Sequence, residues 1–263
     1  MANLEVFSKT DVGTVRTTNE DSLIVTKLGS IHLLAVADGL GGHAAGEVAS
    51  KVALVEVEEF LKANLAEDNL REAVKGAVAK ANKEIHLLSK ENAAYQGMGS
   101  TLVLAIVSGN KALIANVGDS RAYLIGEHVE RVTRDHSLVR ELVDRGVISE
   151  EQAVDHPQKN VVTRSLGAGG EVVPDFYDWE LSGNTLLLCS DGLTDTLTED
   201  EIIETIAASA DLDQACRRLI ELANRKGATD NVTVILARET PSAGTRADGS
   251  DDLQRRGIAK DHA

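Results

Sequence analysis

The chain has 263 residues, of which 43% are hydrophobic and 26% are charged, values that fit a soluble globular protein of one large or two small domains. Its formal net charge of −15, from 27 Lys and Arg against 42 Asp and Glu, argues against nucleic acid or an anionic membrane as a partner. Its two cysteines make no disulfide framework, and neither a signal peptide nor a membrane-length apolar run is recognisable, so a cytoplasmic protein is expected.

Seven short runs rich in aliphatic and β-branched residues predict β-strands. In chain order they are 22–28, 31–37, 101–109, 111–118, 121–126, 185–190 and 231–238. Turn-forming pairs such as Gly29-Ser30 and Gly109-Asn110 join neighbouring runs, which favours antiparallel hairpins.

Apolar residues at helical spacing predict two long helices at about 44–64 and 68–90, and a further pair at 199–208 and 211–226. Because the hairpins are grouped and the helices come in pairs, a doubly wound parallel sheet is not favoured. We predict an α+β fold in which a central antiparallel β-sandwich is flanked by helix pairs, a four-layer αββα arrangement.

The chain is expected to form one domain over residues 1–240, with an insertion at about 138–170. Apolar residues become scarce after about residue 240, so a flexible tail is expected at 241–263.

Six carboxylates stand at the ends of five predicted strands, where a sheet can hold a site on rigid supports. They are Glu20, Asp21, Asp38, Asp119, Asp191 and Asp230. Turn chemistry explains each Asp-Gly or Gly-Asp pair taken alone. If the side chains converge, however, their charges raise one another's pKa values unless a cation lies between them. Oxygen donors without a Cys or His cluster favour Mg²⁺ or Mn²⁺.

The stretch AVADGLGGHAAGE, residues 35–47, places four glycines at the junction between an apolar run and a predicted helix. Such a loop typically holds a phosphate on backbone N–H groups. Asp38 lies in the same loop and would repel a phosphate, so we predict that a metal ion lies between them.

Eight segments occur in a fixed order and cover about residues 5–238. They are VRTTNEDS (15–22), VADGLGGHAAGE (36–47), GSTLVLAIV (99–107), ANVGDSRAYLI (115–125), VTRDHSL (132–138), VVTRSLG (161–167), LLLCSDGLTD (186–195) and GATDNVTVIL (227–236). In this order they resemble the metal-dependent serine/threonine protein phosphatases of type 2C. The short form DGxGGH resembles that of bacterial members.

The resemblance implies a phosphatase that uses two Mn²⁺ or Mg²⁺ ions, with a possible weaker third. It assigns Asp38 to bridge the two ions. Asp191 and Asp230 complete the protein ligands of the first ion, and Glu20 with the Gly39 carbonyl completes those of the second. A hydroxide shared by the ions then attacks phosphorus in line, without a phosphoenzyme.

Further roles follow from the same resemblance. Asp21 orients bound water, Asp119 with Asp191 matches the weaker third-metal position, and the guanidinium of Arg16 clamps two phosphate oxygens. Many eukaryotic members have a His directly after the Asp-Gly pair as the proton donor to the leaving alkoxide. This chain has Leu40 there, so the proton comes either from a metal-bound water or from His43.

The insertion at 138–170 matches the flap beside the catalytic cleft in this family. Its basic side chains could attract a phosphorylated peptide, or they could belong to an ordinary solvent-exposed helix surface without a binding role. They are Arg140, Arg145, Lys159 and Arg164. Ser120 and Arg121 are expected to shape a turn, and Asn231 to fix the loop beside Asp230.

The expected partners are phosphoserine and phosphothreonine proteins made by a cognate Ser/Thr kinase, and the chain is expected to be a monomer without nucleic-acid or membrane partners. Two alternatives stay open at this point. One is a non-enzymatic pseudophosphatase that binds phosphoproteins, although every predicted ligand is present. The other is a regulatory phosphatase of anti-sigma antagonists, although those generally lack the clamp that Arg16 provides.

Overall fold

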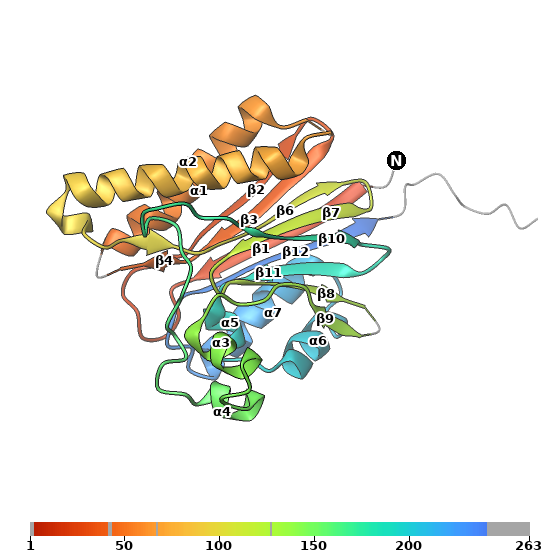
Figure 1. Cartoon of the computed structure of the whole chain (residues 1–263). Helices are drawn as coiled ribbons and strands as arrows, with labels where there is room; N and C mark the ends of the chain where they lie inside the picture. The colour runs from red at the N-terminus through yellow and green to blue at the C-terminus, as the bar shows by residue number, and fades with distance from the viewer. Residues whose placement is uncertain (1–2, 42–43, 67, 127, 241–263) are drawn as a thin grey trace, which may run out of the picture.

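Two five-stranded antiparallel sheets packed face to face form the centre of the molecule (Figure 1). The computed structural model describes residues 3–41, 44–66, 68–126 and 128–240. The tail predicted at 241–263 and the candidate His43 lie outside the described residues.

The first sheet has the strand order β1-β12-β11-β8-β9, and the second has the order β10-β7-β6-β3-β2. The strands of the first are β1 (Asn3–Asp11), β12 (Val232–Thr240), β11 (Thr185–Cys189), β8 (Arg121–Ile125) and β9 (Val129–Arg131). The strands of the second are β10 (Asp175–Glu180), β7 (Lys111–Val117), β6 (Leu102–Ser108), β3 (Ile31–Ala37) and β2 (Ser22–Leu28). A two-stranded ribbon pairs β4 (Gly39–Leu40) with β5 (Gly99–Ser100).

Helix pairs cover both outer faces of the sandwich (Figure 1). The helices α1 (Ala44–Asn64) and α2 (Leu70–Glu91) pack on the second sheet through one apolar cluster. The helices α6 (Glu199–Ala207) and α7 (Leu212–Arg225) pack on the first sheet through another. A third cluster fills the space between the sheets. The predicted αββα sandwich is confirmed.

The unbroken apolar run of β3 follows from its position in the centre of the second sheet. Leu33 and Ala35 face the helix layer, whereas Leu34 and Val36 face the other sheet. Both faces of the strand are therefore buried, and period-two alternation of apolar and polar residues is absent.

Five of the described strands were not predicted. Two of them, β4 and β5, are only two residues long, and the other three lie at sheet edges. These three are β1, β9 and β10, each paired with one neighbour. Their sequences mix charged and apolar residues, as in the DFYDWE of β10. An edge strand tolerates charged side chains because it is less enclosed and must resist pairing with other chains, so its sequence signal is weak.

The two ends of the insertion pair with each other where it leaves the sandwich. The Leu138 N–H donates to the Val161 carbonyl at 2.8 Å, and Ser137 forms a β-bridge with Val162. We use the name flap for residues 138–161, between these pairings. The flap holds two short helices, α3 (Leu138–Asp144) and α4 (Glu150–Val154), and neither has a fully buried residue.

None of the described helices combines the length and the apolar character that a membrane span needs.

Candidate functional site

Strand register brings the predicted acidic positions to one end of the sandwich. In the second sheet Ser22 pairs with Ala37, so Asp21 and Asp38 lie just beyond paired strand ends. In the first sheet Cys189 pairs with Val234, which brings the segment of Asp191 next to the start of β12.

The electrostatics of Asp38 show that these side chains share one site. Burial raises the pKa of the Asp38 carboxyl well above its ordinary value, and the charges of Asp21, Asp191, Asp119 and Asp230 raise it further. Four acids from separate parts of the sequence therefore lie close enough to act on one half-buried carboxyl.

Three of these neighbours have raised pKa values of their own. Burial raises the pKa of Asp191 well above its ordinary value, with Asp119 as the next cause. Burial likewise raises the pKa of Asp119 to about 7, helped by the charge of Asp135. Burial raises the pKa of Asp21 to about 6, although hydrogen bonds from hydroxyl groups oppose the shift. The cluster is thus electrostatically costly as long as no cation accompanies it.

Close backbone packing, rather than a special turn conformation, explains the two Asp-Gly pairs. A Cβ on Gly39 would lie 2.1 Å from the Gly46 carbonyl oxygen, and one on Gly192 would lie 2.0 Å from the Asn231 carbonyl oxygen. Neither glycine has a positive φ. Glycine is required at both positions because another segment of backbone occupies the side-chain space.

The first turn of α1 closes one side of the site. A Cβ on Gly46 would lie 2.5 Å from Glu20 Oε2 and 2.7 Å from the Gly39 carbonyl oxygen. These two oxygens therefore border the same small space. The Glu20 backbone is fixed in turn by Asn231, whose Oδ1 accepts from the Glu20 N–H at 2.8 Å. Asn231 also donates to the carbonyls of Val12 and Thr18, so it fixes this loop as the sequence indicated.

The backbone of Asp38 is held by the GST segment. Its N–H donates to Thr101 Oγ1 at 2.9 Å, and its carbonyl accepts from the Thr101 N–H at 2.9 Å and from Ser100 Oγ at 3.1 Å. Thr101 Oγ1 and Ser120 Oγ share a buried hydrogen bond of 2.7 Å. Ser120 therefore supports the site through Thr101, and Arg121 pairs with Asp135 at 2.8 Å, whereas the turn-shaping role of both residues stays a prediction.

Hydroxyl groups that the sequence did not single out fix Asp21. Ser190 Oγ and Thr233 Oγ1 donate to Asp21 Oδ2 at 2.7 and 2.6 Å, and Thr10 Oγ1 lies 2.7 Å from Thr233 Oγ1. The signal that could have revealed them is a polar side chain at an inward position of an otherwise apolar strand. Thr233 is such a residue in β12, where it is fully buried.

Two buried carboxylate oxygens have no hydrogen-bond partner among the described residues, Asp21 Oδ1 and Asp191 Oδ1. An orphaned buried carboxylate oxygen is costly, and a divalent cation or its water would satisfy it. A donor set of carboxylates and one carbonyl suits a hard ion.

Within the described part of the chain, no three His, Cys, Asp or Glu side chains form a compact metal cage. Mg²⁺ binds through few carboxylates and retains several waters, and Mn²⁺ likewise prefers oxygen ligands. An open cluster of acids therefore fits such ions better than it fits a fully ligated metal.

Arg16 lies at the rim of the cluster. Its Nη2 donates to Asp230 Oδ2 at 2.7 Å, and its side chain is 48% exposed. The charges of Glu20 and Asp38 also act on it. The guanidinium is thus held beside the acids while part of it faces solvent.

A cavity of about 250 Å³ separates the flap from the acidic cluster. Asp119, Asp191 and Asp195 line it from the sandwich, and residues of α3 and α4 line it from the flap. The structure therefore places the flap beside the site.

The cations of the insertion are already paired. Lys159 contacts Asp195 at 2.9 Å, and Arg145 contacts Glu141 at 3.3 Å. Arg164 contacts Asp175 at 2.7 Å. Arg140 contacts Asp144 and Glu150, each at 2.8 Å. The view that these residues offer free positive charge to a phosphorylated peptide is not supported.

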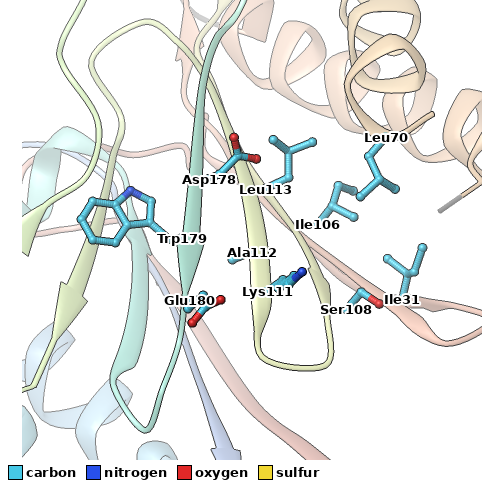
Figure 2. A pocket seen from close by; sticks show the side chains of 10 residues that line it. All are labelled: Ile31, Leu70, Ile106, Ser108, Lys111, Ala112, Leu113, Asp178, Trp179 and Glu180. Carbon is cyan, nitrogen blue, oxygen red and sulfur yellow. The ribbon is translucent and has the colours of Figure 1, made fainter. Parts of the chain in front are cut away.

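Another cavity, of about 710 Å³, lies at the opposite end of the second sheet (Figure 2). Lys111 and Glu180, which pair across β7 and β10, line it, together with the apolar side chains of Ile106 and Leu113. Asp119 follows the other end of β7, so this cavity is separate from the acidic cluster.

Comparison with known proteins agrees with this arrangement. The family model described as Protein phosphatase 2C matches residues 14–237. The serine/threonine phosphatase stp of Listeria monocytogenes is 41% identical over 234 residues, which are 87% of this chain and 93% of that protein.

Two solved structures are also similar. The serine/threonine phosphatase Stp1 from Staphylococcus aureus superposes with a TM-score of 0.86 at 38% identity, over 90% of this chain and 95% of that one. The catalytic domain of the serine/threonine protein phosphatase PstP, crystallised with two manganese ions, gives a TM-score of 0.81 at 35% identity, over 92% and 100% of the two chains.

Proposed function

Because this chain belongs to the protein phosphatase 2C family and is a serine/threonine protein phosphatase, a phosphoric monoester hydrolase, we propose that it hydrolyses phosphoserine and phosphothreonine in one direct step, without a phosphoenzyme. We propose Mn²⁺ or Mg²⁺ as its cofactor, and substrates made by a cognate Ser/Thr kinase. The manganese-bound PstP relative supports the choice of metal.

The half-buried Asp38 carboxyl, on which the charges of four other acids act, is the observation that carries this proposal. Asp38, Asp191 and Asp230 would hold one ion. Asp38 with Glu20 and the Gly39 carbonyl would hold the other, since the Glu20 and Gly39 oxygens border one space.

Asp21 and Asp119 have supporting roles in this proposal. Asp21 orients water through Oδ1, because its other oxygen is occupied by two hydroxyl groups. Asp119 belongs to a weaker third site. Two divalent ions, when bound, lower the pKa of a water towards neutrality and so supply the nucleophile.

Arg16 binds the phosphate of the substrate. Its guanidinium has a planar fork of donors that matches two phosphate oxygens, and it already lies beside Asp230 at the rim. The clamp therefore orients phosphorus over the acidic cluster.

Hydrolysis of p-nitrophenyl phosphate and of a phosphothreonine peptide tests the proposal. We expect turnover with Mn²⁺, loss of turnover on addition of EDTA, and loss of turnover in Asp38→Asn. Full activity of protein rigorously stripped of divalent cations would contradict it.

A further inference from the structure

The flap displays apolar side chains to solvent beside the site. Val147, Val154 and Val161 are 64%, 66% and 42% exposed, and Val15, next to the proposed clamp Arg16, is 65% exposed. Single exposed apolar residues need no explanation. Of the three exposed valines of the flap, Val154 also lines the cavity, so it lies where a chain bound at the proposed reaction site would pass.

The flap offers little positive charge to such a chain. Each of its cations that borders the cavity, Arg140 and Lys159, contacts a carboxylate. The cations of the sandwich that line the same cavity, Arg121 and Arg131, both contact Asp135.

Negative charge on α4, by contrast, faces solvent. Glu151 and Asp155 are exposed, and no Lys, Arg or His within the described ranges pairs with either. Acids in the first turn stabilise a helix, which accounts for Glu151. Asp155 is the C-cap residue of α4, where a negative charge opposes the helix dipole. Helix stability therefore does not explain Asp155.

The position of α4 links this charge to the reaction. Glu150, Ala153 and Val154 of α4 line the cavity that Asp119 and Asp191 line from the other side. A peptide whose phosphorylated residue enters the acidic cluster would lay its neighbouring residues along α4.

We infer that the flap selects phosphopeptides in which basic and apolar residues flank the phosphorylated Ser or Thr, and disfavours acidic flanks. This inference rests on the proposed function. A basic side chain would place its aliphatic stem on Val154 and its charge near Glu151 and Asp155. The net charge of −15 of the protein also attracts basic peptides, over longer distances than the flap does.

Two phosphothreonine peptides of equal length test the inference, one with Arg and Val around the phosphothreonine and one with Glu in place of each Arg. At low ionic strength with Mn²⁺, we expect kcat/KM to be about tenfold higher for the basic peptide, a typical electrostatic steering effect. The ratio should fall towards unity at about 0.5 M NaCl, because salt screens exposed charges.

Variants assign the preference to α4. In Glu151→Lys/Asp155→Lys the ratio of kcat/KM between the basic and the acidic peptide should fall at least about threefold, because two attractive charges become repulsive. The neutral Glu151→Gln/Asp155→Asn pair should give a ratio between that of the wild type and that of the Lys variant. The control Glu59→Lys/Glu221→Lys makes the same change of charge at exposed positions of α1 and α7 and should keep the wild-type ratio.

Hydrolysis of p-nitrophenyl phosphate by the wild type separates two kinds of failure. If the wild type hydrolyses it but treats both peptides equally, or if the flap variants keep the wild-type ratio, the inference is overturned and the proposed function stands. If the wild type hydrolyses neither p-nitrophenyl phosphate nor the peptides, both are overturned.

Discussion

Arg16 and Asp230 form an ion pair of 2.7 Å across the mouth of the acidic cluster. The contact joins two segments separated by more than two hundred residues of sequence. The second oxygen of Asp230 accepts from the Asn231 N–H at 2.8 Å, so the carboxylate is fixed on both sides. The proposed phosphate clamp is thus held by a proposed metal ligand.

Replacement of Arg16 by Ala should weaken substrate binding. The variant loses a charged, two-pronged contact to phosphate, and hydrogen bonds to charged groups contribute about 1.5–3 kcal/mol. We expect KM for a phosphopeptide to rise roughly tenfold to hundredfold, while calorimetry shows Mn²⁺ still bound. Arg217→Ala, which removes an exposed ion pair within α7, is the control. An unchanged KM in Arg16→Ala would refute the clamp.

Without metal, the stability of the protein should fall as the pH rises. Burial raises the pKa of Asp21 to about 6 and that of Asp119 to about 7. A carboxyl whose pKa is higher in the folded state stabilises the fold at pH below its unfolded value of about 4, and this contribution is lost as pH rises through the folded pKa. Melting temperatures of EDTA-treated protein should therefore fall between about pH 5 and pH 8, and Mn²⁺ should reduce the fall.

Asp38→Asn provides the matched variant. The amide keeps the shape of the side chain and removes the charge of a carboxyl whose pKa is raised well above its ordinary value. The EDTA-treated variant should melt at least about 3 °C above the EDTA-treated wild type at pH 8, the effect of about 1 kcal/mol in a chain of this size. A lower melting temperature of Asp38→Asn would show that the charge of Asp38 does not destabilise the metal-free fold.

Gly192→Ala should disrupt the site through the backbone. Its Cβ would lie 2.0 Å from the Asn231 carbonyl oxygen, so the segments that carry Asp191 and Asp230 must separate. A loss of about 3 kcal/mol, or a fall in melting temperature of roughly 6–12 °C, is expected. In Gly29→Ala the Cβ meets nothing within 4 Å at a φ of +64°, so only the left-handed strain of about 1 kcal/mol remains. Equal losses in the two variants would contradict the packing argument.

His43→Ala tests the source of the leaving-group proton. We propose His43 as the donor, because it is the histidine nearest in sequence to Asp38 and the position directly after Asp38-Gly39 is Leu40, which cannot donate a proton. The variant should lose the basic limb of the pH–rate profile, which reports loss of the donor proton. A profile with both limbs unaltered would assign the proton to water.

The sequence predicted the buried strands and the long helices because their apolar patterns are strong. The predicted 44–64 helix matches α1, and all seven predicted strands are present. Among the missed strands, β1, β9 and β10 are edge strands whose charged residues conceal the pattern, and β4 and β5 are too short to show one. The four-residue helix α5 (Asp191–Thr194) was also missed, because one turn is too short to show periodicity.

The acids of the site could be predicted because each stands at a strand end, where spacing and residue type are visible in one short stretch. The hydroxyls that hold Asp21 could not be predicted, because Ser190 and Thr233 lie far from it in sequence. The pairing of Lys159 with Asp195 likewise depends on how the flap folds back, which no local pattern encodes.

A crystal structure grown with Mn²⁺, with anomalous scattering measured at the manganese edge, tests the central claim most directly. We predict two manganese peaks in contact with Asp38, one of them also contacting Asp191 and Asp230 and the other also contacting Glu20 and the Gly39 carbonyl. Full occupancy of manganese elsewhere, with Asp38 contacting none, would contradict the account.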